Sequence, residues 1–358
     1  MKKVLFMISV AAVTFASCSN ESTEFVGDNS PKEIAFMPVN QKATRAAVQG
    51  TTFPTANTME VAAYMSQVSE GTPGNYFSKT TFKKDTSEDL WRAWSESSNS
   101  YTPIYWPLNV STLNFFAISG SGVSASDITI DDNLGTASVA YTTTSYSQTT
   151  QSDIMYAFGR GSVAKSGSSL TFGTDGKVSM AFSHALALVN FQVKGVNAGI
   201  GGITINSITL HGASFNGTLG ITNANATTPA TTVTTNLDWT SVTAAEDYTL
   251  TLNHILTADF YPADNGTWAA VMIIPSDQTG NTPTPRGFTT FTINYTFGGH
   301  TYNYTYAPSG YTSDNPNLTS VAAGHKYTYT ISMELHEIKI DPSVTTWTAE
   351  TPVAVPNI

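Results

Sequence analysis

The sequence is poor in cysteine and in charge, and each shortage excludes a class of protein. Of its 358 residues only Cys18 is a cysteine, so no intramolecular disulfide forms and core burial must stabilise the fold. Charged residues make up 12% of the chain, about half of the usual share. The formal net charge is −10, and no basic stripe occurs. Such a chain cannot neutralise phosphates, which excludes nucleic acid as a partner.

Motifs for catalysis and metal binding are also absent. The six histidines lack the spacing of a zinc site, and no G-x-S-x-G motif occurs. The pairs Asp131-Asp132 and Glu246-Asp247 are expected to be turn residues, since neighbours on a strand face opposite ways. His184 lies in an apolar segment and is expected to be a hydrogen-bonded structural residue. We therefore predict no enzyme, no metal site and no cofactor.

Long apolar runs are missing too, but the N-terminus has a short one. No run of about 18 apolar residues occurs, so no transmembrane helix is predicted. Residues 1–17 are predicted to be a signal peptide, with Lys2 and Lys3 before an apolar segment and small residues before Cys18. This arrangement resembles the lipobox of bacterial lipoproteins, which implies acylation of Cys18, with palmitate or a similar chain, and an outer-membrane anchor. An ordinary signal peptide that contains a cysteine is the alternative.

Short alternating runs rich in Val, Ile, Thr, Tyr and Phe recur along the rest of the chain, separated by Gly, Asn, Asp, Ser and Pro. This pattern is typical of half-buried antiparallel strands, with one face on a core and one in water. The predicted strands are Val61–Met65, Thr112–Ile118, Ala125–Ile130, Ala185–Val193, Ile203–His211, Thr249–Leu252, Trp268–Ile274, Phe288–Phe297, His300–Tyr306 and Lys326–Leu335. Many short strands at this spacing favour β-sandwiches or barrels.

The best candidate for a domain boundary is Ile221 to Thr235, a Thr/Asn/Ala/Pro-rich stretch. We therefore predict two β-sandwich domains, 46–222 and 223–358, after a signal peptide (1–17) and a tether with a propeptide (18–45).

Several short motifs occur in a distinctive order. They are Glu33-Ile34-Ala35-Phe36, Ala43-Thr44-Arg45-Ala46, Tyr105-Trp106-Pro107, Leu113-Asn114-Phe115-Phe116-Ala117, Asp153-Ile154-Met155-Tyr156-Ala157, Phe182-Ser183-His184-Ala185-Leu186-Ala187, Gly324-His325-Lys326-Tyr327-Thr328-Tyr329, Val344 and Trp347. Each is weak alone, but the set resembles the fimbrillin family of Bacteroidales, the type V pilus subunits and their relatives.

The resemblance implies a fold and a route of assembly. It implies two transthyretin-like antiparallel β-sandwich domains in tandem, in an exported lipoprotein of the cell surface and fimbrium. It also implies cleavage between Arg45 and Ala46, which removes a strand carrying Ile34, Phe36 and Val39. A strand from another pilin subunit would then fill the groove by donor-strand exchange. The alternative is that Arg45 is an exposed linker residue and the segment stays attached.

The C-terminal segment leaves the place of the subunit in the pilus open. Val353, Val355 and Ile358 are apolar enough to form a donor strand, but the segment is short and contains two prolines. We expect a minor or tip-like subunit rather than a stalk subunit.

A second hypothesis is a surface lipoprotein that binds glycans and does not polymerise. The cluster Trp91-Arg92-Ala93-Trp94 and the run Tyr302, Tyr304 and Tyr306 would then stack on sugar rings. The alternative for both is a place in the core or in cross-strand pairs.

Overall fold

The structure is a computed structural model that describes residues 30–39, 58–88, 90–143, 151–166, 169–196, 202–229, 232–243, 246–262, 269–275, 287–307, 321–334 and 338–346. The described residues form strands and two short 3-10 helices, and no α-helix occurs among them. The elements are β1 (Ala35–Val39), β2 (Met59–Val68), β3 (Gly74–Asp85), β4 (Leu90–Ser95), β5 (Ser100–Tyr101), β6 (Ser111–Ser119), η1 (Ala125–Asp127), β7 (Ile128–Ile130), β8 (Thr136–Tyr141), β9 (Met155–Ser166), β10 (Ser169–Phe172), η2 (Gly173–Gly176), β11 (Lys177–Ala181), β12 (Ser183–His184), β13 (Ala187–Gly195), β14 (Thr204–Ala213), β15 (Gly217–Ala224), β16 (Thr234–Thr240), β17 (Glu246–Ile255), β18 (Ala269–Ile273), β19 (Thr290–Phe297), β20 (His300–Tyr306), β21 (His325–Met333) and β22 (Ile338–Thr346).

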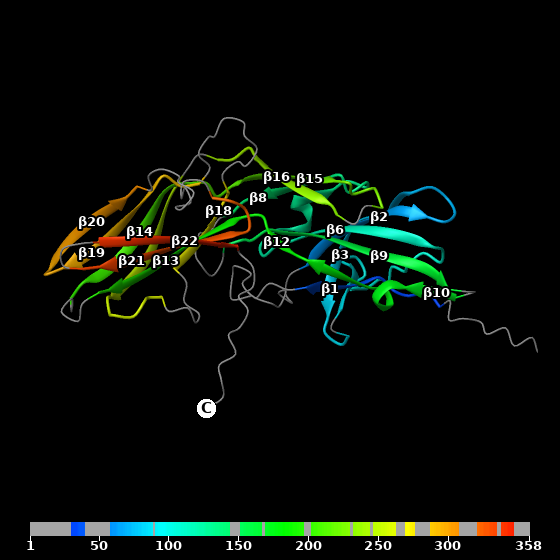
Figure 1. The fold of residues 1–358 in the computed structure, drawn as a ribbon, viewed down its shortest axis with the longest axis horizontal. Helices are drawn as coiled ribbons and strands as arrows, with labels where there is room; N and C mark the ends of the chain where they lie inside the picture. Colours follow the sequence, from blue (N-terminus) through cyan, green and yellow to red (C-terminus); the bar gives the residue numbers. More distant parts are fainter. Residues whose placement is uncertain are drawn as a thin grey trace, which may run out of the picture.

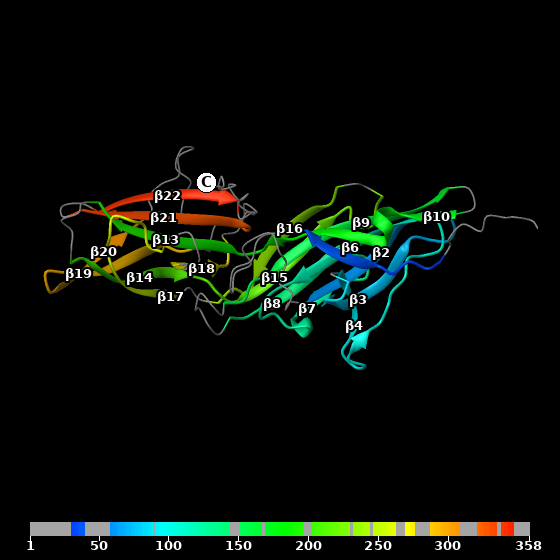
Figure 2. The same ribbon diagram turned by 90° about the horizontal axis from the view of Figure 1, so that it is seen from below.

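Two β-sandwich units lie end to end along the long axis of the molecule (Figures 1 and 2). The first unit has a sheet of order β10-β9-β6-β2-β3-β4-β1-β11, with β12 on β9 and β5 on β4, and a second sheet β16-β15-β8-β7. The second unit packs sheet β18-β13-β21-β22 against sheet β17-β14-β19-β20. Most neighbouring strands are antiparallel, while β1 with β11 and β13 with β21 are parallel. The prediction of an all-β fold with tandem sandwiches is confirmed; the transthyretin-like detail stays a prediction.

Strands in the middle of the molecule are buried on both faces, unlike the half-buried strands that alternation predicts. On β6, Leu113 and Phe115 enter one core, and Phe116 and Ile118 enter another. The second of these cores lies between the first unit's two sheets and also takes in Met272 of β18. This shared core joins the two units. In the second unit, alternation does hold along β21 and in the first half of β19, where buried and half-buried residues alternate.

The predicted boundary between residues 222 and 223 falls inside β15. β15 and β16 form a hairpin that pairs with β8 of the first unit, and Ile221 and Trp239 are buried in the shared core. β13 and β14 precede this hairpin in sequence, yet they pair with strands of the second unit. The chain therefore crosses between the units more than once and does not divide at residue 222.

Two local predictions were wrong in detail. Residues 125–127 form η1 rather than the start of a strand, and Ser124 and Asp127 form a capping box there. Asp131-Asp132 lies outside the strands, between β7 and β8, as expected. Glu246-Asp247 instead begins β17, where the Asp247 carboxylate lies 2.8 Å from Nδ1 of His211.

Buried polar contacts hold the junction between the units. His184 is 2% exposed, and its Nδ1 lies 2.9 Å from the carboxylate of Asp153, which confirms the hydrogen-bonded structural histidine. Two residues before Asp153, the side-chain amide of Gln151 donates to the carbonyl of Met272, and its oxygen accepts the Met272 N–H at 2.7 Å. Gln151 thus acts as a one-residue strand partner for the edge of β18.

Candidate functional site

The N-terminal strand β1 is the candidate functional site, because it is a core strand supplied by the start of the described chain. It pairs in parallel with β11, from Ala35 opposite Lys177 to Val39 opposite Ala181. With β4 it shares the single pair Phe36 and Trp91. The preceding residues add backbone hydrogen bonds, from Ile34 N–H to the Ile104 carbonyl at 2.7 Å and from Trp106 N–H to the Lys32 carbonyl at 2.9 Å. In Figure 1, β1 lies at the lower side of the right-hand unit.

Two side chains anchor β1 in the core of the first unit. Ile34 and Phe36 are both 0% exposed. The Phe36 ring packs edge-on against Phe82 at 4.8 Å and against Phe115 at 5.3 Å. Such edge-to-face pairs stabilise beyond the burial of area alone. We call the place that β1 fills, between β4 and β11 and over Phe82 and Phe115, the β1 site.

A cluster of charges fixes the start of this segment. Arg92 of β4 donates from Nε and Nη2 to the two carboxylate oxygens of Glu33, at 2.9 and 2.8 Å. Its Nη1 donates to Asp85 at 2.8 Å, and Glu88 lies 3.7 Å away. Lys32 makes a more exposed ion pair with Asp175 at 3.2 Å. An ion pair in which a half-buried arginine donates two parallel hydrogen bonds to one carboxylate is stronger than a neutral hydrogen bond.

Charge and hydrogen bonding shift the pKa values in this cluster. Hydrogen bonds from Ser87 and then Arg92 lower the pKa of Asp85 to about 2. The hydrogen bond to Glu33, ahead of that to Asp85, raises the pKa of Arg92 above its usual value. Because the pKa of Asp85 falls on folding, its stabilising effect is present above the unfolded pKa near 4 and is lost as the pH falls toward 2.

The structure describes three of the predicted site residues and leaves the others outside the described ranges. Ile34 and Phe36 lie together in the core, and Val39 ends β1 opposite Ala181. The other predicted residues, Cys18, Arg45, Ala46, Val353, Val355 and Ile358, lie outside the described residues.

Sequence reasoning missed the contact between Arg92 and Glu33. The two residues are 59 positions apart, so no local pattern joins them. The available signal was composition: charges are rare in this chain, and an arginine between two tryptophans in a strand is unusual.

The proposed sugar-stacking aromatics divide into buried and exposed sets. Trp91 is 1% exposed and belongs to the core, so its proposed role in stacking on sugars is wrong. Trp94 packs edge-on against Tyr101, with the Lys83 ammonium 4.5 Å from its ring. Tyr306 packs against the core, while Tyr302 and Tyr304 are 43% and 36% exposed.

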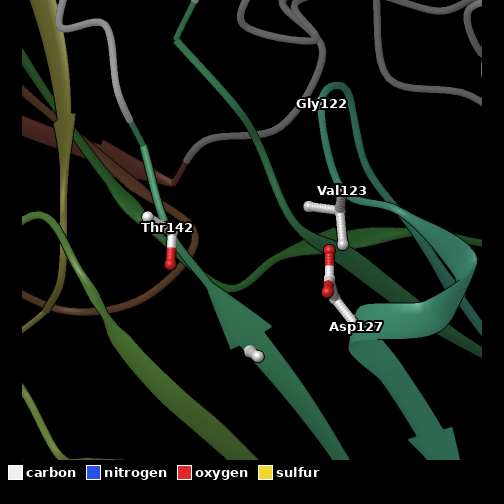
Figure 3. A pocket seen from close by; sticks show the side chains of 5 residues that line it. Gly122, Val123, Asp127 and Thr142 are labelled. Carbon is white, nitrogen blue, oxygen red and sulfur yellow. The ribbon is translucent and has the colours of Figure 1, made fainter.

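Other places in the described part of the chain offer little chemistry. A shallow hollow of about 160 Å³ beside η1 is lined by Gly122, Val123, Asp127, Ala140 and Thr142 (Figure 3). Asp127 is its one ionisable lining residue, and this carboxylate accepts the Ser124 N–H of the capping box. Among the described residues, no three or more His, Cys, Asp or Glu side chains gather in a way that could hold a metal ion. Within the same described residues, no helix has the length and apolar character to cross a membrane.

Comparison with known proteins gives one family and several solved structures of low sequence identity. No curated protein matches the chain. A fimbrial protein from Bacteroides vulgatus is 16% identical, with 88% of this chain and 100% of that one covered and a TM-score of 0.46. The tip fimbrial protein Mfa3 from Porphyromonas gingivalis, truncated at its C-terminus, is 12% identical, with 88% and 100% covered and a TM-score of 0.42.

A family model carries the assignment. The model described as fimbrillin-like matches residues 44–347, which is most of the chain and includes nearly all the strands described above. This match confirms the resemblance seen in the sequence motifs. The chain belongs to the fimbrillin-like family.

Proposed function

We propose that the chain is a subunit of a cell-surface fimbrium, and that it assembles by replacing β1 with a strand of another subunit. In this proposal the chain is exported with residues 1–17 as signal peptide and held at the outer membrane by acylated Cys18. A protease then cuts between Arg45 and Ala46, and the segment 18–45 leaves with β1. Fimbrillins are structural subunits rather than enzymes, in agreement with the expectation that the chain has no catalytic role.

One observation carries this proposal: Ile34, just before β1, and Phe36 within it are fully buried, yet the ladder of β1 is short. Five residue pairs join it to β11, from Ala35 with Lys177 to Val39 with Ala181, and one pair joins it to β4. A strand with such anchors leaves apolar pockets and unpaired backbone groups when it is removed. An exposed edge of this kind is a template for strand addition.

The apolar residues of the C-terminal segment have the same spacing as those of the β1 segment, which suits this segment to act as a donor strand. Val353, Val355 and Ile358 repeat the spacing of Ile34, Phe36 and Val39. Proline is not an obstacle at every position, because Pro38 lies within β1 itself. This spacing supports a donor role for the C-terminal segment of this chain. Its shortness and its two prolines still favour a minor or tip-like subunit.

Limited proteolysis tests the first step. In the chain without residues 1–17, an arginine-specific protease is expected to cut first after Arg45, because Arg92 is tied into the cluster around β4 and Arg160 lies within β9. Trypsin is unsuitable, because it also cuts after lysine and Lys42 stands three residues before Arg45. The fourth arginine, Arg286, lies outside the described residues, and the fragment masses distinguish a cut there from a cut after Arg45. Intact mass would show the cut, and size-exclusion chromatography would show uptake of a peptide of residues 348–358 or formation of oligomers. An Arg45→Gln variant is the control. Resistance at Arg45, or a cut protein that never accepts a strand, would contradict strand exchange.

A second candidate function is glycan binding through the β19–β20 hairpin. Tyr302 and Tyr304 are exposed, and the ring of Tyr302 stacks on Tyr295 at 5.4 Å. Figure 1 shows the hairpin at the left end of the molecule, beyond the ends of β21 and β22. Exposed tyrosine faces of this kind suit the apolar faces of sugar rings.

This second candidate predicts a measurable loss on a glycan array. If the hairpin binds sugars, Tyr302→Ala and Tyr304→Ala should each reduce binding about tenfold, since stacked aromatic contacts contribute on the order of 1 kcal/mol or more. Tyr105→Ala is the matched control, because Tyr105 is also exposed, at 48%, but lies in the first unit. Absence of glycan binding by the unaltered chain would remove this candidate.

A further inference from the structure

We propose that Arg92 selects the strand that fills the β1 site by requiring a carboxylate at the place of Glu33, one residue before the first buried anchor. This inference rests on the proposed strand exchange and adds a rule for the partner. The apolar anchors of β1 can be matched by many alternating segments. A charged residue at a defined place is more discriminating, because an unmatched charge is costly to cover.

The geometry of Arg92 separates its two sets of partners. Both carboxylates of the folded body, Asp85 and Glu88, approach the same nitrogen, Nη1. The other edge of the guanidinium, Nε with Nη2, binds the two carboxylate oxygens of Glu33. Departure of β1 therefore opens the one edge that binds a carboxylate with two parallel hydrogen bonds.

The guanidinium is held in place by groups that do not leave with β1. Asp85 is itself fixed by the Ser87 N–H at 2.9 Å and hydroxyl at 2.6 Å. The Arg92 guanidinium carbon lies 5.3 Å from the Tyr101 ring, and the Tyr101 hydroxyl donates to the Lys84 carbonyl at 2.7 Å. An arginine that is already oriented loses little freedom when it binds, which favours selection by this residue.

The second ion pair of the segment provides a contrast. Lys32 bonds to Asp175, but these side chains are 36% and 73% exposed, against 18% and 21% for Arg92 and Glu33. Exposed pairs contribute little because solvent screens them. Selection by charge should therefore depend on the place of Glu33 and hardly on that of Lys32.

Selection by Arg92 would disfavour the C-terminal segment of this chain as the occupant of the β1 site. When Val353, Val355 and Ile358 are aligned with Ile34, Phe36 and Val39, Pro352 stands at the place of Glu33. This segment has the anchors but lacks the carboxylate. The preferred occupant of the β1 site is therefore a strand of a different subunit, one that carries Asp or Glu immediately before its first anchor.

The test is a peptide competition on protein cut after Arg45. A fluorescent peptide of residues 28–42 is bound first, and unlabelled peptides displace it, with anisotropy as the readout. The Glu33→Gln peptide is expected to bind at least about tenfold more weakly than the unaltered peptide, since hydrogen bonds to a charged group are the stronger kind. The Lys32→Gln peptide is the matched control and should stay within about threefold.

Two further comparisons assign the effect to Arg92. On an Arg92→Gln protein, the unaltered and Glu33→Gln peptides should bind within about threefold of each other. On the unaltered protein, a peptide of residues 348–358 should gain about tenfold in affinity from Pro352→Glu. If Arg92→Gln fails to fold, the peptide substitutions on the unaltered protein still decide the question.

The outcomes separate the two proposals. Equal binding of the unaltered and Glu33→Gln peptides would overturn selection by Arg92 and leave strand exchange intact. Failure of the cut protein to bind the fluorescent peptide at all would overturn strand exchange and, with it, the selection rule.

Discussion

Replacing Phe36 with alanine is expected to lower the free energy of unfolding by about 3–5 kcal/mol, the usual cost of truncating a buried phenylalanine. Phe36 is fully buried, and its ring contacts those of Phe82 and Phe115. The substitution removes both ring contacts and leaves a cavity beneath β1. Urea unfolding of the chain without residues 1–17 would measure the loss.

The neighbouring residue supplies the control for this prediction. Met37 lies on the same strand but is 36% exposed, so Met37→Ala should cost less than about 1 kcal/mol. After a cut at Arg45, the Phe36→Ala protein should also release its N-terminal segment sooner, as size-exclusion chromatography would show. A loss below about 1 kcal/mol for Phe36→Ala would mean that β1 contributes little to the core in solution.

Replacing Gln151 with alanine is expected to cost about 2–4 kcal/mol of unfolding free energy. Its amide satisfies the N–H and the carbonyl of Met272, which is itself 2% exposed. Alanine would leave two buried backbone groups without these partners, and each such group costs about 1–3 kcal/mol. The affected strand, β18, contributes to the core that joins the two units.

Hydrogen exchange would locate the effect of Gln151→Ala. The amide of Met272 should lose protection in the variant, and urea unfolding should shift to a lower midpoint. Gln67→Ala is the matched control, since Gln67 is an exposed glutamine on β2 and should change stability by less than about 0.5 kcal/mol. Unchanged protection at Met272 would show that the Gln151 amide is not needed at this edge.

The local sequence pattern was enough to predict the strands in which alternate residues face the core and the solvent. The runs of β19 and β21 alternate in the sequence, and burial alternates along β21 and over residues 290–293 of β19. The sequence predicts that the apolar Ile34 and Phe36 belong to a buried strand segment, and both are core residues of the first unit. In each case a period of two along the chain is a local property, so no knowledge of partners is needed.

Pattern failed where a strand's partners decide its environment. β6 mixes polar and apolar residues in its sequence, as a half-buried strand does. Its residues are nevertheless buried on both faces, because the second sheet of the first unit covers the face that carries Phe116 and Ile118. The Thr/Asn/Ala/Pro-rich stretch near residue 222 resembles a linker. Its first residues instead belong to β15, which pairs with β16 on one side and with β8 of the first unit on the other. Composition records neither of these pairings.

The sequence by itself determined the all-β class, the family and the apolar anchors of β1, because these depend on composition, local periodicity and the order of short motifs. Only the tertiary structure decided which strands share a sheet, that β15 and β16 return to the first unit, and that Arg92 meets Glu33. Gln151 and Met272, 121 residues apart, show the same limit. Contacts of this kind form only when distant strands come together, so their specificity arises from sheet pairing rather than from any local stretch of sequence.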